Sequence, residues 1–213
     1  LHLSRKLKPL EKSEKRNTGY KTMVDIAILG EAYGEQEALQ NKPFVGASGR
    51  ELRRMLSSAG IDFDSCFVSN VFNIRPPSND ISYFFTDRKS GTGAYGPHRP
   101  GRFLDPAHEH HLLRLSTELK AAAPKLIIAL GNTPLWFLTR QLPKISRERG
   151  VIFSSLYGKA IATYHPAAVL RDWSLRPIVI ADLMKAKGES ASREIKRTSR
   201  EIWIKPSLFD IVD

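Results

Sequence analysis

Three reactive side chains follow short apolar segments of this sequence. Glu31 comes soon after the apolar residues 23–29, Asn70 lies near the end of a second segment, and His165 follows a third. A carboxylate, an amide and an imidazole can exchange protons, read hydrogen-bond donors and acceptors, and stabilise developing charge. They would form a hydrolytic or ligand-reading site if the fold brought them together.

A glycine-rich segment offers a different chemistry. Gly46, Ser48 and Gly49 stand at the start of residues 48–59, where apolar side chains recur at helical spacing. Backbone amides at a helix start suit a phosphate group, although a glycine-rich turn is often only a turn.

The charge balance points to the same kind of ligand. Lys and Arg number 33 against 22 Asp and Glu, a formal net charge of +11. Nucleic acid is therefore the expected partner, and a solvated basic surface is the alternative. The single cysteine, Cys66, excludes a disulfide framework or a four-thiolate metal site made within this chain, and it suits a reducing, intracellular location. We find no apolar run of 18 residues and no signal peptide, so we expect no membrane association.

The order of apolar segments predicts the elements that position these groups. Strands are expected at 23–29, 66–72, 126–130 and 160–164, and helices at 48–59, at 108–123, from Thr133 and Pro134, and at 177–187. Alternating strands and helices predict a three-layer α/β/α sandwich with a central four-stranded parallel sheet, whose carboxyl ends carry the functional groups. We divide the chain into a basic lead-in (1–22), one domain (23–190) and a tail (191–213); residues 78–106 are expected to be an irregular insert, mobile or forming a binding loop.

Four ordered motifs carry a resemblance to a known family. The chain contains GEAYGE at 30–35, PFVGASG at 43–49, NVFNIRPP at 70–77 and HPAAVLR at 165–171. This set resembles the uracil-DNA glycosylase superfamily, especially its branch with a GEAPGE loop, a PFVGxAG segment, an NVxxCRPP strand and an HPS motif. The resemblance covers about residues 23–187.

The resemblance implies a pocket for a base rotated out of the DNA stack. Phe44 would stack on the base, Ala32 and Tyr33 would line its pocket, and Asn70 would read its hydrogen-bonding edge, with Asn73 as a rival reader. A phenylalanine packed in the core and an asparagine bound to loop backbone are the structural alternatives for Phe44 and Asn70.

The resemblance also implies the catalytic groups. His165 would donate a hydrogen bond to the uracil O2 as charge develops there, and Glu31 would orient or activate water, with Glu35 as second choice. Either carboxylate is alternatively a solvated loop residue.

The remaining matches concern the DNA strand. Ser48, Gly49, Arg75 and Arg171 are expected to contact phosphates, while Val169 and Leu170 would enter the space left by the flipped base. The alternative is that the two apolar residues only begin a packed helix.

Four positions depart from the family pattern. Tyr33 replaces a proline and either lines or obstructs the pocket, Asn73 replaces a lysine, Ile74 replaces a cluster cysteine, and Ala167 replaces the serine of HPS. With one cysteine in the chain, no iron-sulfur cluster is expected, and apolar packing must brace that region.

We therefore expect a monomeric hydrolase that excises uracil from DNA without a metal or organic cofactor. The alternative is a weak or inactive DNA-binding or polymerase-accessory module, because residues 200–206 resemble the junction before a phage-type family A DNA polymerase. A DNA polymerase or other replication partner is then expected at the tail, in a nucleoid or a phage-infected cell. An unrelated nucleotide-binding domain is disfavoured, since the glycine loop matches neither a P-loop nor a dinucleotide motif.

Overall fold

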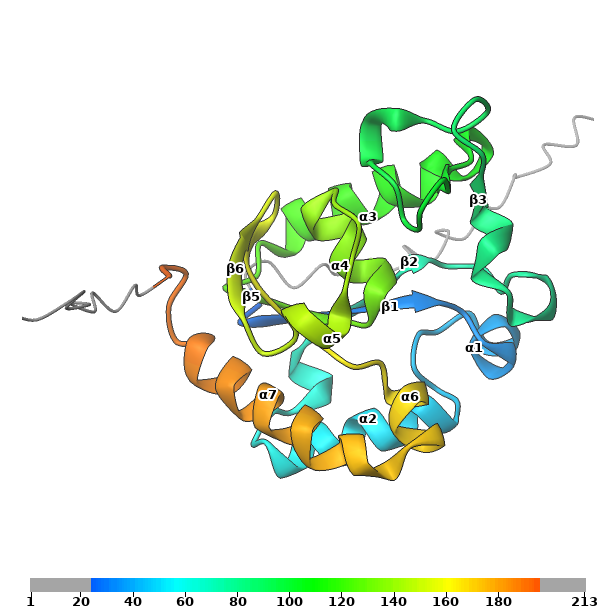
Figure 1. Ribbon diagram of the computed structural model, residues 1–213. Helices are drawn as coiled ribbons and strands as arrows, with labels where there is room; N and C mark the ends of the chain where they lie inside the picture. The colour runs from blue at the N-terminus through cyan, green and yellow to red at the C-terminus, as the bar shows by residue number, and fades with distance from the viewer. Residues whose placement is uncertain (1–23, 196–213) are drawn as a thin grey trace, which may run out of the picture.

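A five-stranded sheet forms the centre of the computed structural model, which describes residues 24–195 (Figure 1). Its strands lie in the order β2-β1-β5-β7-β6. Their bounds are β1 Ile26–Ala32, β2 Phe67–Phe72, β5 Leu126–Leu130, β6 Ile152–Ser155 and β7 Gly158–Thr163. Neighbouring strands are parallel except β6, which pairs antiparallel with β7. The expected α/β/α sandwich is confirmed, with five strands in place of four.

Strand β6 escaped prediction for a local reason. It is four residues long, it ends in Ser154 and Ser155, and it joins β7 through the turn before Gly158. A short edge strand needs no apolar run, because one side of it pairs with no other strand. The first strand was also placed too early: β1 continues past Gly30 through Glu31 and Ala32.

Helices cover both faces of the sheet (Figure 1). Their bounds are α1 Glu35–Gln40, α2 Ala47–Ser58, α3 Glu109–Ala122, α4 Asn132–Thr139, α5 Ile145–Glu148, α6 Pro166–Arg171 and α7 Arg176–Glu189. Helices α3 and α4 bury their apolar residues in one core cluster, and α2, α6 and α7 bury theirs in a second cluster on the opposite face. None of the helices in residues 24–195 combines the length and apolar character that crossing a bilayer requires.

The insert at 78–106 is a packed part of the first cluster. Strands β3 (Phe85–Thr86) and β4 (Phe103–Leu104) pair antiparallel, and short 3-10 helices flank them at Pro77–Asn79, Ile81–Phe84, Gly93–Tyr95 and Pro106–His108. Phe84, Phe85 and Leu104 are buried, and the Trp136 indole of α4 donates a hydrogen bond to the Gly96 carbonyl at 3.2 Å. The insert therefore forms one wall of the domain.

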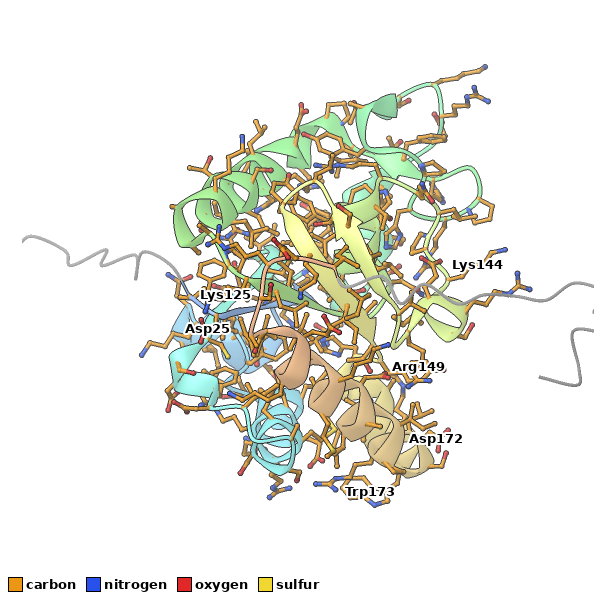
Figure 2. All side chains as sticks on the ribbon, turned by 90° about the vertical axis from the view of Figure 1, so that its left-hand side faces the viewer. Asp25, Lys125, Lys144, Arg149, Asp172 and Trp173 are labelled. Carbon is orange, nitrogen blue, oxygen red and sulfur yellow. The ribbon has the colours of Figure 1, made fainter. Side chains whose placement is uncertain are left out.

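The two ends of the sheet carry different groups. Asp25 and Lys125 form a 2.9 Å ion pair beside the amino ends of β1 and β5, and Figure 2 shows them on the side of the molecule away from Lys144. Lys144 immediately precedes α5 in the loops at the carboxyl ends of the strands. Residues 1–22 and most of the predicted tail, from residue 196, lie outside the described residues.

Candidate active site

A cavity of about 230 Å³ opens where β1, β2 and β7 end. Its lining contains all the residues predicted to bind the base or to catalyse, which are Glu31, Ala32, Tyr33, Phe44, Asn70 and His165. Ser48, a predicted phosphate contact, also lines it. The carboxyl ends of parallel strands meet at one edge of a sheet, which is why groups far apart in sequence converge here. In particular, Phe44, Asn70 and His165 surround one space.

Tyr33 lines this cavity and leaves space beside it. Its backbone N–H donates to the Ile74 carbonyl at 3.2 Å, which joins the end of β1 to the segment after β2. Burial raises the pKa of the Tyr33 phenol, so its hydroxyl stays protonated at neutral pH. Tyr33, which replaces the family proline, thus forms part of the cavity wall and offers one hydroxyl for hydrogen bonding.

Phe44 is held in an unusual backbone conformation. Its φ is +56°, in the left-handed region that non-glycine residues seldom adopt, and its side chain is only 4% exposed. A Cβ atom at Gly49 would lie 1.9 Å from the Phe44 carbonyl oxygen, so only glycine lets α2 approach this closely. The Phe44 ring lies 6.1 Å from the His165 ring at an interplanar angle of 29°. The loop therefore presents an aromatic face to the cavity.

Glu37 explains how this loop is fixed. Its side chain is buried, and Oε1 accepts a hydrogen bond from the Gly46 backbone N–H at 2.7 Å. This contact ties α1 to the start of α2 across the loop that carries Phe44. Sequence reasoning did not select Glu37, because its partner is a backbone group nine residues away.

Asn70 turns an unpaired amide towards the cavity. It is 3% exposed, and within residues 24–195 its side-chain amide has no hydrogen-bond partner. Its backbone carbonyl accepts from the Arg114 guanidinium at 2.7 Å, which fixes the end of β2. Because an amide offers both a donor and an acceptor, a ring with the complementary pair of groups can satisfy it.

His165 is set up as a neutral hydrogen-bond donor. Its Nδ1 accepts from the Ala167 backbone N–H at 3.1 Å, so in the neutral ring the proton is on Nε2. Burial lowers the pKa of His165 to about 4, with the Arg171 charge acting in the same direction. The ring therefore offers an Nε2–H group without a positive charge at neutral pH.

Glu31 lies at the edge of the same cavity. Its Oε2 accepts a hydrogen bond from the Thr133 hydroxyl at 2.5 Å. Burial raises the pKa of the Glu31 carboxyl, while the Thr133 hydrogen bond and the charges of Arg99 and Arg171 oppose that rise. A carboxylate in this setting is a candidate base or anion beside a reacting group.

A second cavity, of about 650 Å³, shares Glu31 and His165 with the first. Arg99, Lys144 and Arg171 line it. These cations come from the insert, from the residue before α5 and from the end of α6. The pocket for a small ring therefore opens beside a basic groove suited to a phosphate chain.

The other predicted DNA contacts are less uniform. Arg75 donates to the Asn79 side chain at 3.0 Å and lies 3.6 Å from the Glu35 carboxylate. Val169 is fully buried in the second core cluster, whereas Leu170 is 48% exposed. The prediction of a two-residue wedge is therefore wrong for Val169: its position on α6 turns it into the core, and only Leu170 faces solvent.

The two rival residues point elsewhere. The Asn73 side-chain oxygen lies 2.7 Å from His111 Nδ1, a contact with α3 that takes its amide away from the cavity. Glu35 is exposed on α1. Asn70 and Glu31 are thus the amide and the carboxylate that the fold favours.

Gly30 opens the GEAYGE motif, but the sequence assigned it no contact in the site. It pairs with Asn70 in the β1–β2 register, and a Cβ atom here would lie 2.1 Å from Asn70 Oδ1 and 2.5 Å from Phe44 Cζ. Its missing side chain lets the amide and the ring approach each other. No sequence pattern could reveal this contact, because it joins three separate segments.

Replacing Gly30 with alanine is therefore expected to slow any reaction in the cavity by about 10²-fold, since the two contact groups must both move. The thermal unfolding temperature should change little, because the displaced atoms are side-chain ends. Gly93→Ala is the control, as a Cβ there meets nothing within 4 Å. Equal rates for the two variants would show that the close packing at Gly30 is unimportant.

The residues here do not fit an iron-sulfur cluster. Such clusters need several thiolates, and this chain has one cysteine, Cys66, just before β2. Ile74 is 37% exposed, so it does not itself pack in place of the cluster. Phe72 instead stacks on Phe84 of the insert with ring centroids 3.8 Å apart. Aromatic packing thus braces the end of β2.

Comparison with known proteins agrees with this geometry. Residues 18–186 match the uracil DNA glycosylase superfamily. A Type-4 uracil-DNA glycosylase from Archaeoglobus fulgidus is 30% identical over 200 residues, which cover 87% of this chain and 81% of that protein. The enzyme of the same name from Thermotoga maritima is 34% identical over 166 residues, 76% of each chain, and that from Saccharolobus solfataricus is 28% identical over 183 residues, 80% of this chain and 74% of the relative. The chain belongs to the uracil DNA glycosylase superfamily.

Proposed function

We propose that this protein hydrolyses the bond between uracil and deoxyribose in DNA. The observation that carries the proposal is the convergence of Phe44, Asn70 and the Nε2–H of His165 on one cavity beside a basic groove. The Type-4 uracil-DNA glycosylases that resemble the chain support it independently.

Recognition follows from the cavity's hydrogen-bonding groups. Phe44 offers a ring face for stacking, worth about 1 to 3 kcal/mol per base and able to offset part of the cost of flipping. The Asn70 amide accepts from the uracil N3–H and donates to O4, whereas cytosine presents the opposite pattern. Arg114 holds the Asn70 backbone, so the reading group enters from a fixed strand end.

Bond cleavage places negative charge on the departing base and positive character on the sugar. The His165 Nε2–H stabilises the first by donating to the uracil O2, and a neutral ring suffices for this. The Glu31 carboxylate, which lines the same cavity, orients a water molecule or accepts its proton. The water oxygen bonds to the sugar C1′ as the bond from C1′ to the uracil nitrogen breaks, and the released proton passes to Glu31 or to solvent.

The test is a time course of abasic-site formation on single- and double-stranded oligonucleotides containing one uracil. We expect product from both substrates and none from matched cytosine or thymine strands. Folded protein that releases no uracil at high concentration would contradict the proposal. Binding without a preference for uracil would then favour the alternative, a DNA-binding module with the same fold.

The DNA strand would follow the groove next to the cavity. Arg171 and the amides at Ser48 and Gly49 would hold phosphates, with Leu170 entering the stack and Arg75 at the rim. Such contacts make affinity fall as salt rises. A monomeric state, an intracellular setting and a replication partner for the tail stay predictions.

A further inference from the structure

A buried histidine of the insert lies behind the catalytic carboxylate. His98 is 4% exposed, and its Nε2 lies 3.0 Å from the Thr133 hydroxyl oxygen. Thr133, at the start of α4, is fully buried and donates to Glu31 Oε2 at 2.5 Å. A continuous chain of hydrogen bonds therefore runs from the insert to Glu31.

The direction of each hydrogen bond is fixed by proton count. The Thr133 hydroxyl has one hydrogen, and an ionised Glu31 carboxylate, 2.5 Å away, can only accept it. The hydroxyl oxygen must then accept from His98, which places the His98 proton on Nε2. His98 Nδ1 is buried without a hydrogen-bond partner in the described chain, as expected for a neutral ring whose second nitrogen carries no proton.

The insert holds the His98 ring in place. The ring stacks on Phe85 with centroids 4.1 Å apart at 16°, and its edge meets Trp136 at 5.5 Å. Its backbone N–H donates to the Arg102 carbonyl at 3.0 Å within a tight turn. Burial, with Arg99 alongside, lowers the pKa of His98 to about 4. The ring thus stays neutral and fixed in orientation across the ordinary working range of pH.

We propose that His98 and Thr133 are positioning residues for Glu31. The His98 ring orients the Thr133 hydroxyl, and that hydroxyl holds the Glu31 carboxylate charged and correctly directed beside the reacting sugar. The inference deepens the proposed glycosylase function and rests on it for its catalytic meaning. The 78–106 insert then contributes to the reaction, because it carries His98.

Other charged groups face Glu31 and must be separated from this effect. Arg99 from the insert and Arg171 from α6 favour its charged form, whereas Glu37 and His165 share its cavity without supplying a positive charge at neutral pH. Both arginines are solvent-exposed, where water and salt screen their influence. The Thr133 contact is buried and directional, so its removal is the sharper perturbation.

The experiment compares Thr133→Val, which removes the hydroxyl at similar size, with His98→Phe, which keeps a ring against Phe85 but loses the donor. One readout is the pKa of the Glu31 carboxyl group, followed by the ¹³C NMR shift of its carboxyl carbon. The signal is assigned through its absence in Glu31→Gln. The other is the pH profile of kcat/KM for uracil release. The control is Thr139→Val, on the same helix. Within residues 24–195 the Thr139 hydroxyl bonds only the Leu135 carbonyl and the Gln141 N–H.

We expect Thr133→Val to move both the Glu31 pKa and the acid limb of the profile upwards by on the order of one pH unit. The rate on the acid side then falls about tenfold. His98→Phe should shift both in the same direction by less, while Thr139→Val and Thr133→Ser leave them in place.

The outcomes separate the two proposals. If wild-type protein releases no uracil, the proposed function fails, and the NMR titration still decides whether Thr133 and His98 set the charge of Glu31. If uracil is released but Thr133→Val and His98→Phe leave the titration and the acid limb unmoved, the positioning inference is overturned. His98→Phe keeps the test decisive should Thr133→Val fold poorly.

Discussion

Replacing His165 with alanine is expected to slow uracil release by about 10²- to 10³-fold, the usual loss when one donor to a developing anion is removed. The ring's Nδ1 is occupied by the Ala167 N–H, so Nε2–H is the group available to the base. A single-turnover rate measures the loss directly, since substrate binding and product release do not enter it. His110→Ala, on exposed α3 surface, is the control and should retain the wild-type rate.

The same geometry determines the pH dependence that His165 can impose. Since its pKa is lowered to about 4, the ring keeps its Nε2–H and its neutrality across the range in which a free histidine titrates. The wild-type profile should therefore show no transition near 6.5 that disappears in His165→Ala. Such a transition would show that the His165 ring titrates in its ordinary range and is not held neutral. A loss in rate below about tenfold would assign the stabilisation of the leaving base to another group.

The sequence predicted the site residues that lie at or just after the ends of strands. Asn70 lies near the end of one short apolar segment, and His165 follows another. Parallel strands place their carboxyl ends at one edge of a sheet, and the four ordered motifs indicated which residues lie there. The sheet was underestimated only at β6, which is too short and polar to be recognised. Local sequence patterns thus predict core strands and their ends, because a strand buried on both faces needs continuous apolar residues.

Contacts between segments that are distant in sequence could not be predicted from such local patterns. The exposure of Leu170 and the burial of Val169 depend on how a six-residue helix is rotated, and so short a helix gives no periodicity to read. Gly30 has no Cβ atom, which leaves room for the Asn70 side chain beside it. His98 lies in an irregular insert, and only the folded chain shows that it reaches the Glu31 region through Thr133.

Two neighbouring asparagines provide the sharpest test of base recognition. Asn70→Ala should lower kcat/KM for uracil by about 10²-fold, because two hydrogen bonds to the ring are lost and the base's polar edge is left unsatisfied. Asn73→Ala removes the same amide three residues later, where it bonds His111, and should cost little activity. Competition between uracil- and cytosine-containing strands measures the effect on selectivity.

The comparison of these variants distinguishes recognition from general damage to β2. Both shorten a side chain near one strand end, so a change in strand packing would affect the two variants alike. Loss confined to Asn70→Ala, with reduced discrimination against cytosine, means that the cavity reads the base through this amide. Equal losses would instead indicate general damage at the end of β2. Discrimination against cytosine that survives Asn70→Ala would place base selection in other groups of the cavity lining, such as Phe44 and His165.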